Sequence, residues 1–198
     1  RYTERLMNAV QKELRLDRQP RHIECFDNSN LQGAHPVASC VVFRDGKPSR
    51  KEYRHFNIKT VTGADDYASM REVVFRRYTR LMAEGAEMPD LIIADGGKGQ
   101  MGVIHEVLER LGLDIPIAGL AKDDRHRTAE LLCGFPPVLV GIRPTSPLFH
   151  FLAHIQEEVH RFAVSFHRQK RSKAFIHSEL EQIEGCLLYT SPSPRDRT

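Results

Sequence analysis

Strands and helices alternate along the second half of the sequence, and this order restricts the folds that the chain can adopt. The apolar run DLIIAD at 90–95 has the length and composition of a buried strand. The segment QMGVIHEVLERLG comes next and has the spacing of an amphipathic helix that ends at Gly112. The apolar run IPIAGLA at 115–121 then predicts another strand. Such alternation is typical of a sheet covered by helices.

The first half of the sequence predicts one helix followed by strands. Residues 1–16 are strongly charged and helix-forming, and Pro20 closes that segment. The Asp45–Gly46 pair is a hairpin signal between two of the strands that follow. Three strands are predicted in this half, at 22–28, 36–43 and 50–58.

Two further helices are predicted on either side of the strand–helix–strand unit. An apolar stripe at helical spacing predicts a helix over 65–85. A long helix is predicted from Ser146 to about Lys173, with Pro147 in its first turn. Before it, we expect an irregular insertion from KDDRHRT to CGFPP and a strand at 138–142. The hairpin and the later alternation together predict an α/β fold with a mixed sheet covered by helices.

The composition fits one globular core and excludes several classes of protein. Of the 198 residues, 40% are hydrophobic and 28% are charged, and a formal charge of +3 does not by itself indicate nucleic-acid binding. The four cysteines lack zinc-site spacing and indicate no disulfide framework, and we expect Cys25 and Cys40 to be reduced core residues. We find no signal-peptide pattern and no apolar run of membrane-spanning length, and we therefore expect a cytoplasmic protein without a membrane partner.

Two of the predicted strands end in an aspartate on an apolar face. Asp27 shares a strand face with Ile23 and Cys25, and Asp95 shares one with Ile93. If these strands are parallel neighbours, both carboxylates meet at one edge of the sheet. They would repel each other there. A divalent cation such as Mg²⁺ or Mn²⁺ would remove the repulsion, because hard oxygen ligands suit these ions.

A third carboxylate, Asp66, stands at the start of the helix predicted over 65–85 and could join the other two. Each acid also has an ordinary structural explanation. Taken alone, Asp66 is better explained as a first-turn acid favoured by the helix dipole, with Asp65 as the cap. Asp27 and Asp95 are equally turn-forming residues at strand ends. Three acids at matching element ends are less readily explained as turns than any one of them alone.

The segment EEVHRFAVSFHRQKRSK at 157–173 joins histidines to a basic cluster. His160 and His167 are seven residues apart, so they project from nearly the same helix face. Four basic residues follow at once: Arg168, Lys170, Arg171 and Lys173. A histidine capable of general-base or metal chemistry is thus next to charges that could hold phosphates. A helical histidine and a basic helix end are also common structural features.

Three familiar motifs are excluded. The segment DGGKGQ lacks the Ser or Thr that follows the lysine of a P-loop. The segment HFLAH lacks the glutamate of the HExxH zinc motif, so we expect His150 and His154 to be structural. The nucleophile elbow GxSxG does not occur.

Five segments follow one another in a specific order over about residues 22–173. They are FDNSNLQG, YRHFNIKTVTGADDYASM, LIIADGGKGQ, KDDRHRT and HRFAVSFHRQKRSK. Together they resemble the C-terminal endonuclease domain of the UvrC family, the incision subunit of bacterial excinuclease ABC. The resemblance implies an RNase H-like fold and metal-dependent cutting of damaged double-stranded DNA on the 5′ side of a lesion. It also implies UvrA and UvrB as partners in the full excinuclease.

The family's catalytic residues match four positions of this sequence: Asp27, Asp66, Asp95 and His167. The resemblance implies that these residues hold Mg²⁺ or Mn²⁺. It leaves open whether His167 orients a water, deprotonates it or completes the metal shell. Candidate phosphate contacts are Lys59, Lys98, Arg168, Lys170 and Arg171. In the first motif, Asn28 and Asn30 replace the family's usual Ile and His, which puts any role of that histidine in question.

The resemblance also predicts the domain organisation. We expect 1–20 to be a helical linker from a missing N-terminal part, and 21–178 to be the RNase H-like endonuclease domain. We expect 179–198 to be a truncated approach to a helix-hairpin-helix region that ends in an atypical, disordered tail. The family's N-terminal nuclease domain and UvrB-contacting segment have no counterpart in this sequence.

Two alternatives remain open. The chain could be a non-catalytic nucleic-acid-binding or partner-binding module that uses the fold as a scaffold, which predicts that one or more acids are missing or misplaced. It could also be an RNA-cleaving nuclease of the same fold, which a comparison of RNA–DNA hybrid with damaged duplex DNA would decide.

Overall fold

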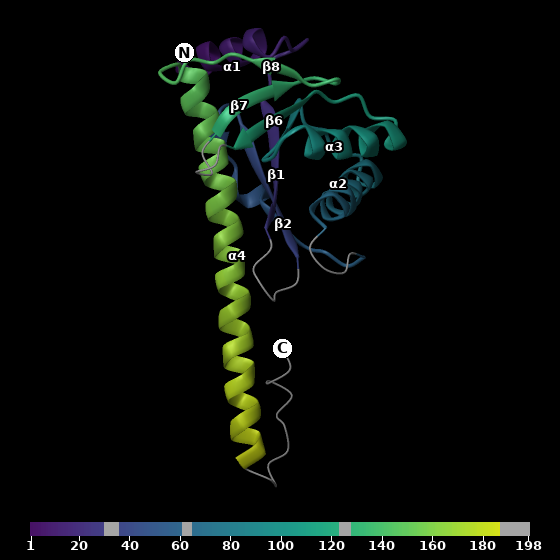
Figure 1. Ribbon diagram of the computed structural model, residues 1–198, viewed down its shortest axis with the longest axis vertical. Coiled ribbons are helices and arrows are strands. Elements are labelled where there is room, and N and C mark those ends of the chain that lie inside the picture. Colours follow the sequence, from purple (N-terminus) through teal and green to yellow (C-terminus); the bar gives the residue numbers. More distant parts are fainter. Residues whose placement is uncertain (30–35, 61–64, 123–127, 187–198) are drawn as a thin grey trace. The chain divides into compact units, whose positions relative to one another are not determined.

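In the computed structural model, which describes residues 1–29, 36–60, 65–122 and 128–186, the strands form one mixed sheet (Figure 1). Residues Arg1–Ala163 form one compact unit and Val164–Thr198 form a second. The helices are α1 (Tyr2–Glu13), α2 (Asp66–Ala83), α3 (Lys98–Leu111) and α4 (Pro147–Cys186), with a short 3₁₀ helix at Arg50–Glu52. The strands are β1 (His22–Ser29), β2 (Val37–Arg44), β3 (Lys47–Pro48), β4 (Arg54–Asn57), β5 (Leu91–Ala94), β6 (Ile117–Lys122), β7 (Thr128–Cys133) and β8 (Val138–Val140).

The order of the strands places β1 and β5 side by side. Across the sheet the order is β3-β2-β1-β5-β6-β7-β8, and β4 also pairs with β2. The β1–β5 and β5–β6 pairs are parallel. The pairs at both sides of this centre, including β1–β2 and β6–β7, are antiparallel. The predicted α/β fold with a mixed sheet is therefore confirmed, with its parallel strands at the centre.

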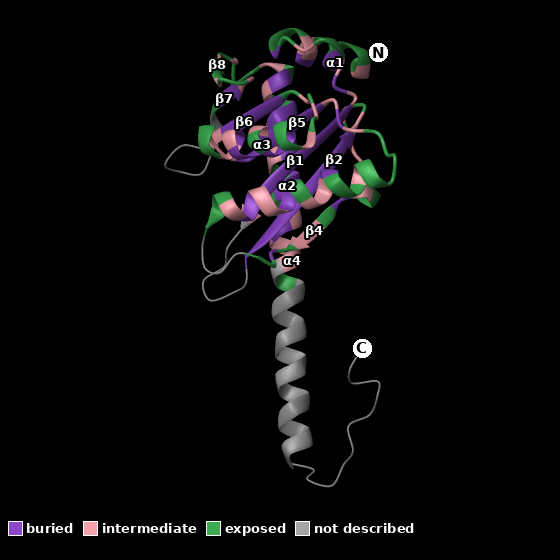
Figure 2. Ribbon diagram, turned by 90° about the vertical axis from the view of Figure 1, so that its right-hand side faces the viewer, coloured by how far each residue is buried: buried purple, intermediate pink, exposed green. Residues whose placement is uncertain are grey.

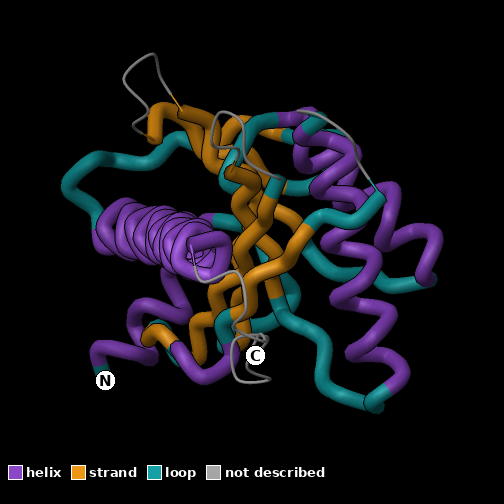
Figure 3. Tube along the Cα trace, turned by 90° about the horizontal axis from the view of Figure 1, so that it is seen from below, coloured by secondary structure: helices purple, strands orange, loops and turns teal. Residues whose placement is uncertain are grey.

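Helices cover both faces of the sheet within the first unit (Figure 3). On one face, α1 and the part of α4 up to Ala163 pack over apolar residues that include Ile23, Cys25 and Ile93. On the other face, α2 and α3 pack over Phe26 and Ile92. Successive residues of a strand point to opposite faces, so each central strand supplies both layers of the core. Figure 2 shows these strands as the most continuously buried elements.

Turn and cap residues end the elements where the sequence predicts. Asp45 and Gly46 have φ values of 52° and 80°, and the β2–β3 hairpin closes across them. Asp65 caps α2 by accepting a hydrogen bond from the backbone N–H of Ala68 at 3.0 Å. Gly112 ends α3 in the left-handed conformation, with φ of 70°.

The structure corrects four of the predicted elements. The expected irregular insertion contains a strand, β7, because TAELLC pairs with β6 on one side and β8 on the other. The strand predicted at 50–58 begins with a 3₁₀ helix and is a strand only over Arg54–Asn57. The strand predicted at 138–142 ends at Val140, and α4 continues to Cys186 rather than to about Lys173. The presence of β7 and the bounds of β4 and β8 depend on pairing with neighbouring strands, which local sequence does not reveal.

The first helix belongs to the core of the first unit. Leu6, Met7 and Val10 of α1 are almost completely buried. That 1–20 links the domain to a preceding part stays a prediction, as do the proposed boundary at 178 and the nature of the tail, whose residues 187–198 lie outside the described residues. None of the described helices has both the length and the apolar character that a membrane crossing requires.

Candidate active site

Asp27 and Asp95 lie next to each other at one edge of the sheet. In the parallel β1–β5 pair, Cys25 is opposite Ile93 and Phe26 is opposite Ala94. The pairing continues by one further hydrogen bond, from the backbone N–H of Asp95 to the carbonyl oxygen of Phe26 at 2.9 Å. The two aspartates are the next residues in this register. The condition set by the sequence, that these two strands are parallel neighbours, is therefore met, and the two acids are adjacent where the parallel pairing ends.

Both aspartates lie on the face of the sheet that α4 covers. Asp27 is 6% exposed and Asp95 is 8% exposed. They follow the alternation of Cys25 and Ile93, which belong to the core under α1 and α4. Gln156 of α4 donates a hydrogen bond from Nε2 to Oδ1 of Asp95 at 3.0 Å. The helix therefore fixes one carboxylate from above the sheet.

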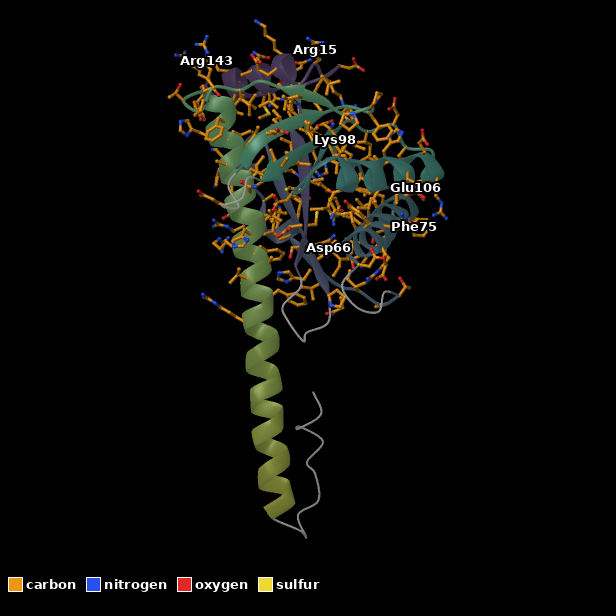
Figure 4. All side chains as sticks on the ribbon, viewed as in Figure 1. Arg15, Asp66, Phe75, Lys98, Glu106 and Arg143 are labelled. Atoms are coloured by element: carbon orange, nitrogen blue, oxygen red, sulfur yellow. The ribbon has the colours of Figure 1, made fainter. Side chains whose placement is uncertain are left out.

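Asp66 begins α2 beside the same strand end. The side chain of Asn28 donates a hydrogen bond from Nδ2 to the backbone carbonyl of Asp66 at 2.7 Å, which ties β1 to the start of α2. The Asp66 side chain is exposed and lines an open pocket of about 780 Å³ together with Lys98, the first residue of α3 (Figure 4). The remaining lining residues are Asp65, Tyr67, Gly96, Gly97, Gly99 and Gln100.

A complete set of ligands is not assembled within the described residues. No three His, Cys, Asp or Glu side chains of these residues lie close enough together to hold a metal ion. His167 lies on α4, but its side chain is outside the described residues, as are those of Lys170 and Arg171. Lys59 is exposed and lines a different pocket. Arg168 is also exposed. The joint site of Asp27, Asp66, Asp95 and His167 stays a prediction.

Comparison with known sequences decides the family. The model of the UvrC RNAse H endonuclease domain matches residues 11–164. The chain belongs to the UvrC family. The UvrABC system protein C of Bacteroides fragilis is 63% identical over 181 residues, and that of Bacteroides thetaiotaomicron is 61% identical over 182 residues. Each match covers 91% of this chain and 30% of the relative, so the chain spans about a third of their length.

The solved structures that match this chain do so at low sequence identity and low TM-score. Endonuclease V of Ciona intestinalis, in complex with DNA containing an inosine, gives a TM-score of 0.42 at 14% identity, covering 68% of this chain and 80% of that one. Argonaute of Clostridium butyricum gives a TM-score of 0.36 at 12% identity, covering 62% of this chain and 16% of that one. The family match confirms the predicted RNase H-like fold class.

A buried carboxylate joins α4 of the UvrC domain to the end of the 3₁₀ helix that precedes β4. Glu158 is 6% exposed and accepts hydrogen bonds from the Tyr53 hydroxyl at 2.8 Å and from Arg161 at 3.0 Å. The Arg161 hydrogen bonds lower the pKa of Glu158 to about 2, against the opposing effect of burial and with the help of Tyr53. Because Gln156 is two residues away on the same helix, these bonds also fix its position over Asp95.

A glycine-dependent contact supports the turn that follows Asp95. A Cβ atom at Gly119 would lie 2.6 Å from Sδ of Met101 and 3.0 Å from the carbonyl oxygen of Gly96. We expect Gly119→Ala to lower the free energy of unfolding by about 1–3 kcal/mol, because backbone must move as well as a side chain. Gly102→Ala, in an uncrowded part of α3, should raise it by about 0.5–1 kcal/mol. Urea unfolding of both variants measures the difference, and equal stabilities would contradict it.

Sequence reasoning missed two residues of this site. Gln156 contacts Asp95 directly, and its position three helical turns before His167 is a signal that could have found it. Ser39 pairs with Asp27 across β1 and β2. Ser39 is two residues from both Val37 and Val41 and shares a strand face with them. Its place on an apolar strand face was therefore also visible in the sequence.

Proposed function

We propose that this chain is the part of a UvrC protein that cuts the damaged DNA strand on the 5′ side of a lesion, by divalent-metal-dependent hydrolysis of a phosphodiester. The observation that carries the proposal is the pair of nearly buried carboxylates, Asp27 and Asp95, where the parallel pairing of β1 with β5 ends. Two adjacent carboxylates with this little exposure offer oxygen ligands of the kind that a divalent cation prefers, and a bound cation reduces the repulsion between them.

The carboxylate pair fits Mg²⁺ or Mn²⁺ even without a third ligand in place. Mg²⁺ is commonly held by one or two carboxylates, while waters and substrate phosphates complete its shell. When bound, the ion would activate a water and stabilise negative charge at the phosphate in the transition state. Asp66 and His167 are proposed as additional ligands, on the resemblance of their motifs to those of the family.

Other residues would orient the carboxylates and the DNA. The hydrogen bond from Gln156 occupies one acceptor position of the Asp95 carboxylate. This contact restrains the rotation of the carboxylate. Lys98 lies in the same pocket as Asp66, where its ammonium group can contact a phosphate. We further propose Lys59, Arg168, Lys170 and Arg171 as phosphate contacts, and His167 as the group that orients or deprotonates the attacking water.

The substrate and the partners are proposed from the family. The relatives are named as protein C of the UvrABC system. We therefore propose damaged double-stranded DNA as the substrate, with UvrA and UvrB as partners in the full excinuclease. A comparison of damaged duplex DNA with an RNA–DNA hybrid tests the substrate: preferential cutting of the hybrid would favour an RNA-cleaving nuclease instead.

A Mn²⁺ titration of the chain tests the metal site directly. We expect saturable binding by the unchanged chain and a loss of at least about tenfold in affinity for Asp27→Asn, which keeps the shape of the side chain but removes its charge. Isothermal titration calorimetry measures the affinity, and circular dichroism confirms that the variant is folded. If no saturable binding depends on Asp27, the chain is better explained as a non-catalytic binding module.

A further inference from the structure

A row of polar side chains crosses the sheet on the face under α4. Asp95 follows β5, Asp27 lies beside it on β1, and Ser39 of β2 is directly opposite Asp27 in the antiparallel β1–β2 pair. His55 of β4 is in turn opposite Ser39. The ring of His55 stacks on Phe162 at a centroid distance of 3.6 Å, and its Nε2 is 2.9 Å from the Phe162 carbonyl oxygen. The row therefore runs beneath α4 from one carboxylate to the histidine.

Ser39 is the member of this row that packing does not explain. The residue is completely buried, and its hydroxyl has no hydrogen-bond partner within the described part of the chain. Buried hydroxyl groups are nearly always hydrogen-bonded, because leaving one without a partner destabilises the fold. Its neighbours on the same strand face, Val41 and Phe43, are apolar core residues. Alanine at this position would avoid the destabilisation that a buried hydroxyl without a partner causes.

A second serine shows which feature of Ser39 is unusual. Ser69 is also buried, and its hydroxyl also lacks a partner within the described residues. Ser69 lies in α2, where a serine hydroxyl can turn to the carbonyl four residues earlier, here that of Asp65. Ser39 lies in β2, between β1 and β4, and a strand offers no carbonyl one helical turn earlier that its hydroxyl could reach. Its partner has to come from the sheet face beneath α4.

We propose that Ser39 is a positioning residue for Asp27: when a divalent cation is bound, the Ser39 hydroxyl donates a hydrogen bond to the Asp27 carboxylate. The Cβ atoms of directly opposite residues in an antiparallel pair lie about 4.5–5.5 Å apart, which puts the hydroxyl within reach of that carboxylate. A carboxylate that binds an ion through one oxygen can accept further hydrogen bonds at its second oxygen, and such outer hydrogen bonds fix the ligand's orientation. The inference rests on the proposed function.

The test measures Mn²⁺ affinity and thermal unfolding in three variants. Ser39→Ala should weaken Mn²⁺ binding about tenfold and leave the melting temperature unchanged or higher. Ser39→Thr keeps the hydroxyl and should bind nearly as well as the unchanged chain. Ser69→Ala is the matched control, since it also removes a buried hydroxyl without a partner within the described residues, and should leave Mn²⁺ affinity unchanged. Calorimetry at constant pH supplies both readouts.

The outcomes separate this inference from the proposed function. If Ser39→Ala binds Mn²⁺ like the unchanged chain while Asp27→Asn does not, the inference is wrong and the metal site stands. If Ser69→Ala weakens Mn²⁺ binding as much as Ser39→Ala does, the loss of affinity is a general effect of changing the core. That result would also overturn the inference. If the unchanged chain does not bind Mn²⁺, both fail together. Should Ser39→Ala not fold, Ser39→Cys keeps the volume with a much weaker donor and should show the same loss of affinity.

Discussion

Asp95→Asn is expected to lower the rate of 5′ incision by about 10²–10³-fold, which corresponds to the several kcal/mol that a bound metal ion contributes to the transition state. Asparagine keeps an oxygen that can still accept the hydrogen bond from Gln156. It removes the negative charge with which Asp95 is proposed to hold the cation beside Asp27. The fold should be unaffected, because the backbone N–H of residue 95 still bonds to Phe26.

The incision assay is best made in a full-length protein. This chain can replace the matching segment of 181 residues in the Bacteroides fragilis relative, and the chimera can be assayed with UvrA and UvrB on a lesion-bearing duplex. Undiminished 5′ cutting by Asp95→Asn would contradict the proposed role of Asp95.

The adjacent acids Asp65 and Asp66 give a matched pair for the same assay. Asp65→Asn should have little effect, because asparagine caps a helix as well as aspartate does. Asp66→Asn should reduce incision, and no reduction would exclude Asp66 as a metal ligand.

Glu24→Gln is expected to lower the free energy of unfolding by about 3–5 kcal/mol, because it leaves a buried arginine without its anionic partner. Glu24 is 1% exposed and accepts two hydrogen bonds from Arg77, at 2.6 and 2.7 Å. The Tyr78 hydroxyl and the His22 ring complete its contacts, each at 2.8 Å. This network joins the first half of β1 to α2, on the face of the sheet opposite to that of Asp27. Chemical denaturation of both proteins measures the loss.

An exposed ion pair provides the control for Glu24. Glu84 and Arg80 form a pair on α2 at 2.9 Å, with side chains 52% and 80% exposed. Glu84→Gln should therefore change stability by less than about 1 kcal/mol. If the two variants lose similar amounts of unfolding free energy, the buried network contributes no more to stability than the exposed pair.

The destabilisation by Glu24→Gln should also depend on pH. Burial alone would raise the pKa of Glu24, but hydrogen bonds from Arg77 and His22 lower it from 4.5 to about 2. A carboxyl whose pKa is lower in the folded state stabilises the fold above the unfolded pKa, and this contribution is lost as the pH falls through the folded value. The stability difference between the two proteins should thus shrink between about pH 4.5 and pH 2.

Local patterns predicted the elements that carry the site. Alternation in HIECFD and DLIIAD placed Asp27 and Asp95 on apolar strand faces, and the structure puts both on the face under α4. Asp65 and Gly112 mark where α2 begins and α3 ends, because a cap or a left-handed turn needs those residue types. Such features depend on residues that are adjacent in the chain, so the sequence alone reveals them.

Contacts between distant segments were beyond the reach of these patterns. β7 was missed because its stability comes from the strands on either side rather than from its own short, partly charged sequence. The hydrogen bond from Gln156 to Asp95 joins α4 to the end of β5, and the pairing of Ser39 with Asp27 depends on the register of β1 with β2. No property of either residue alone specifies these partners.

The sequence by itself determined the family, the elements that carry the site and the acids on two apolar strand faces. Only the tertiary structure decided that β1 and β5 are neighbours, that α4 lies over their ends, and that Ser39 is buried beside Asp27. The physical reason is that strand pairing and helix packing are selected by the burial of apolar surface from many segments at once. Local propensity depends on a few consecutive residues, so it does not specify which strands pair or which helices pack together.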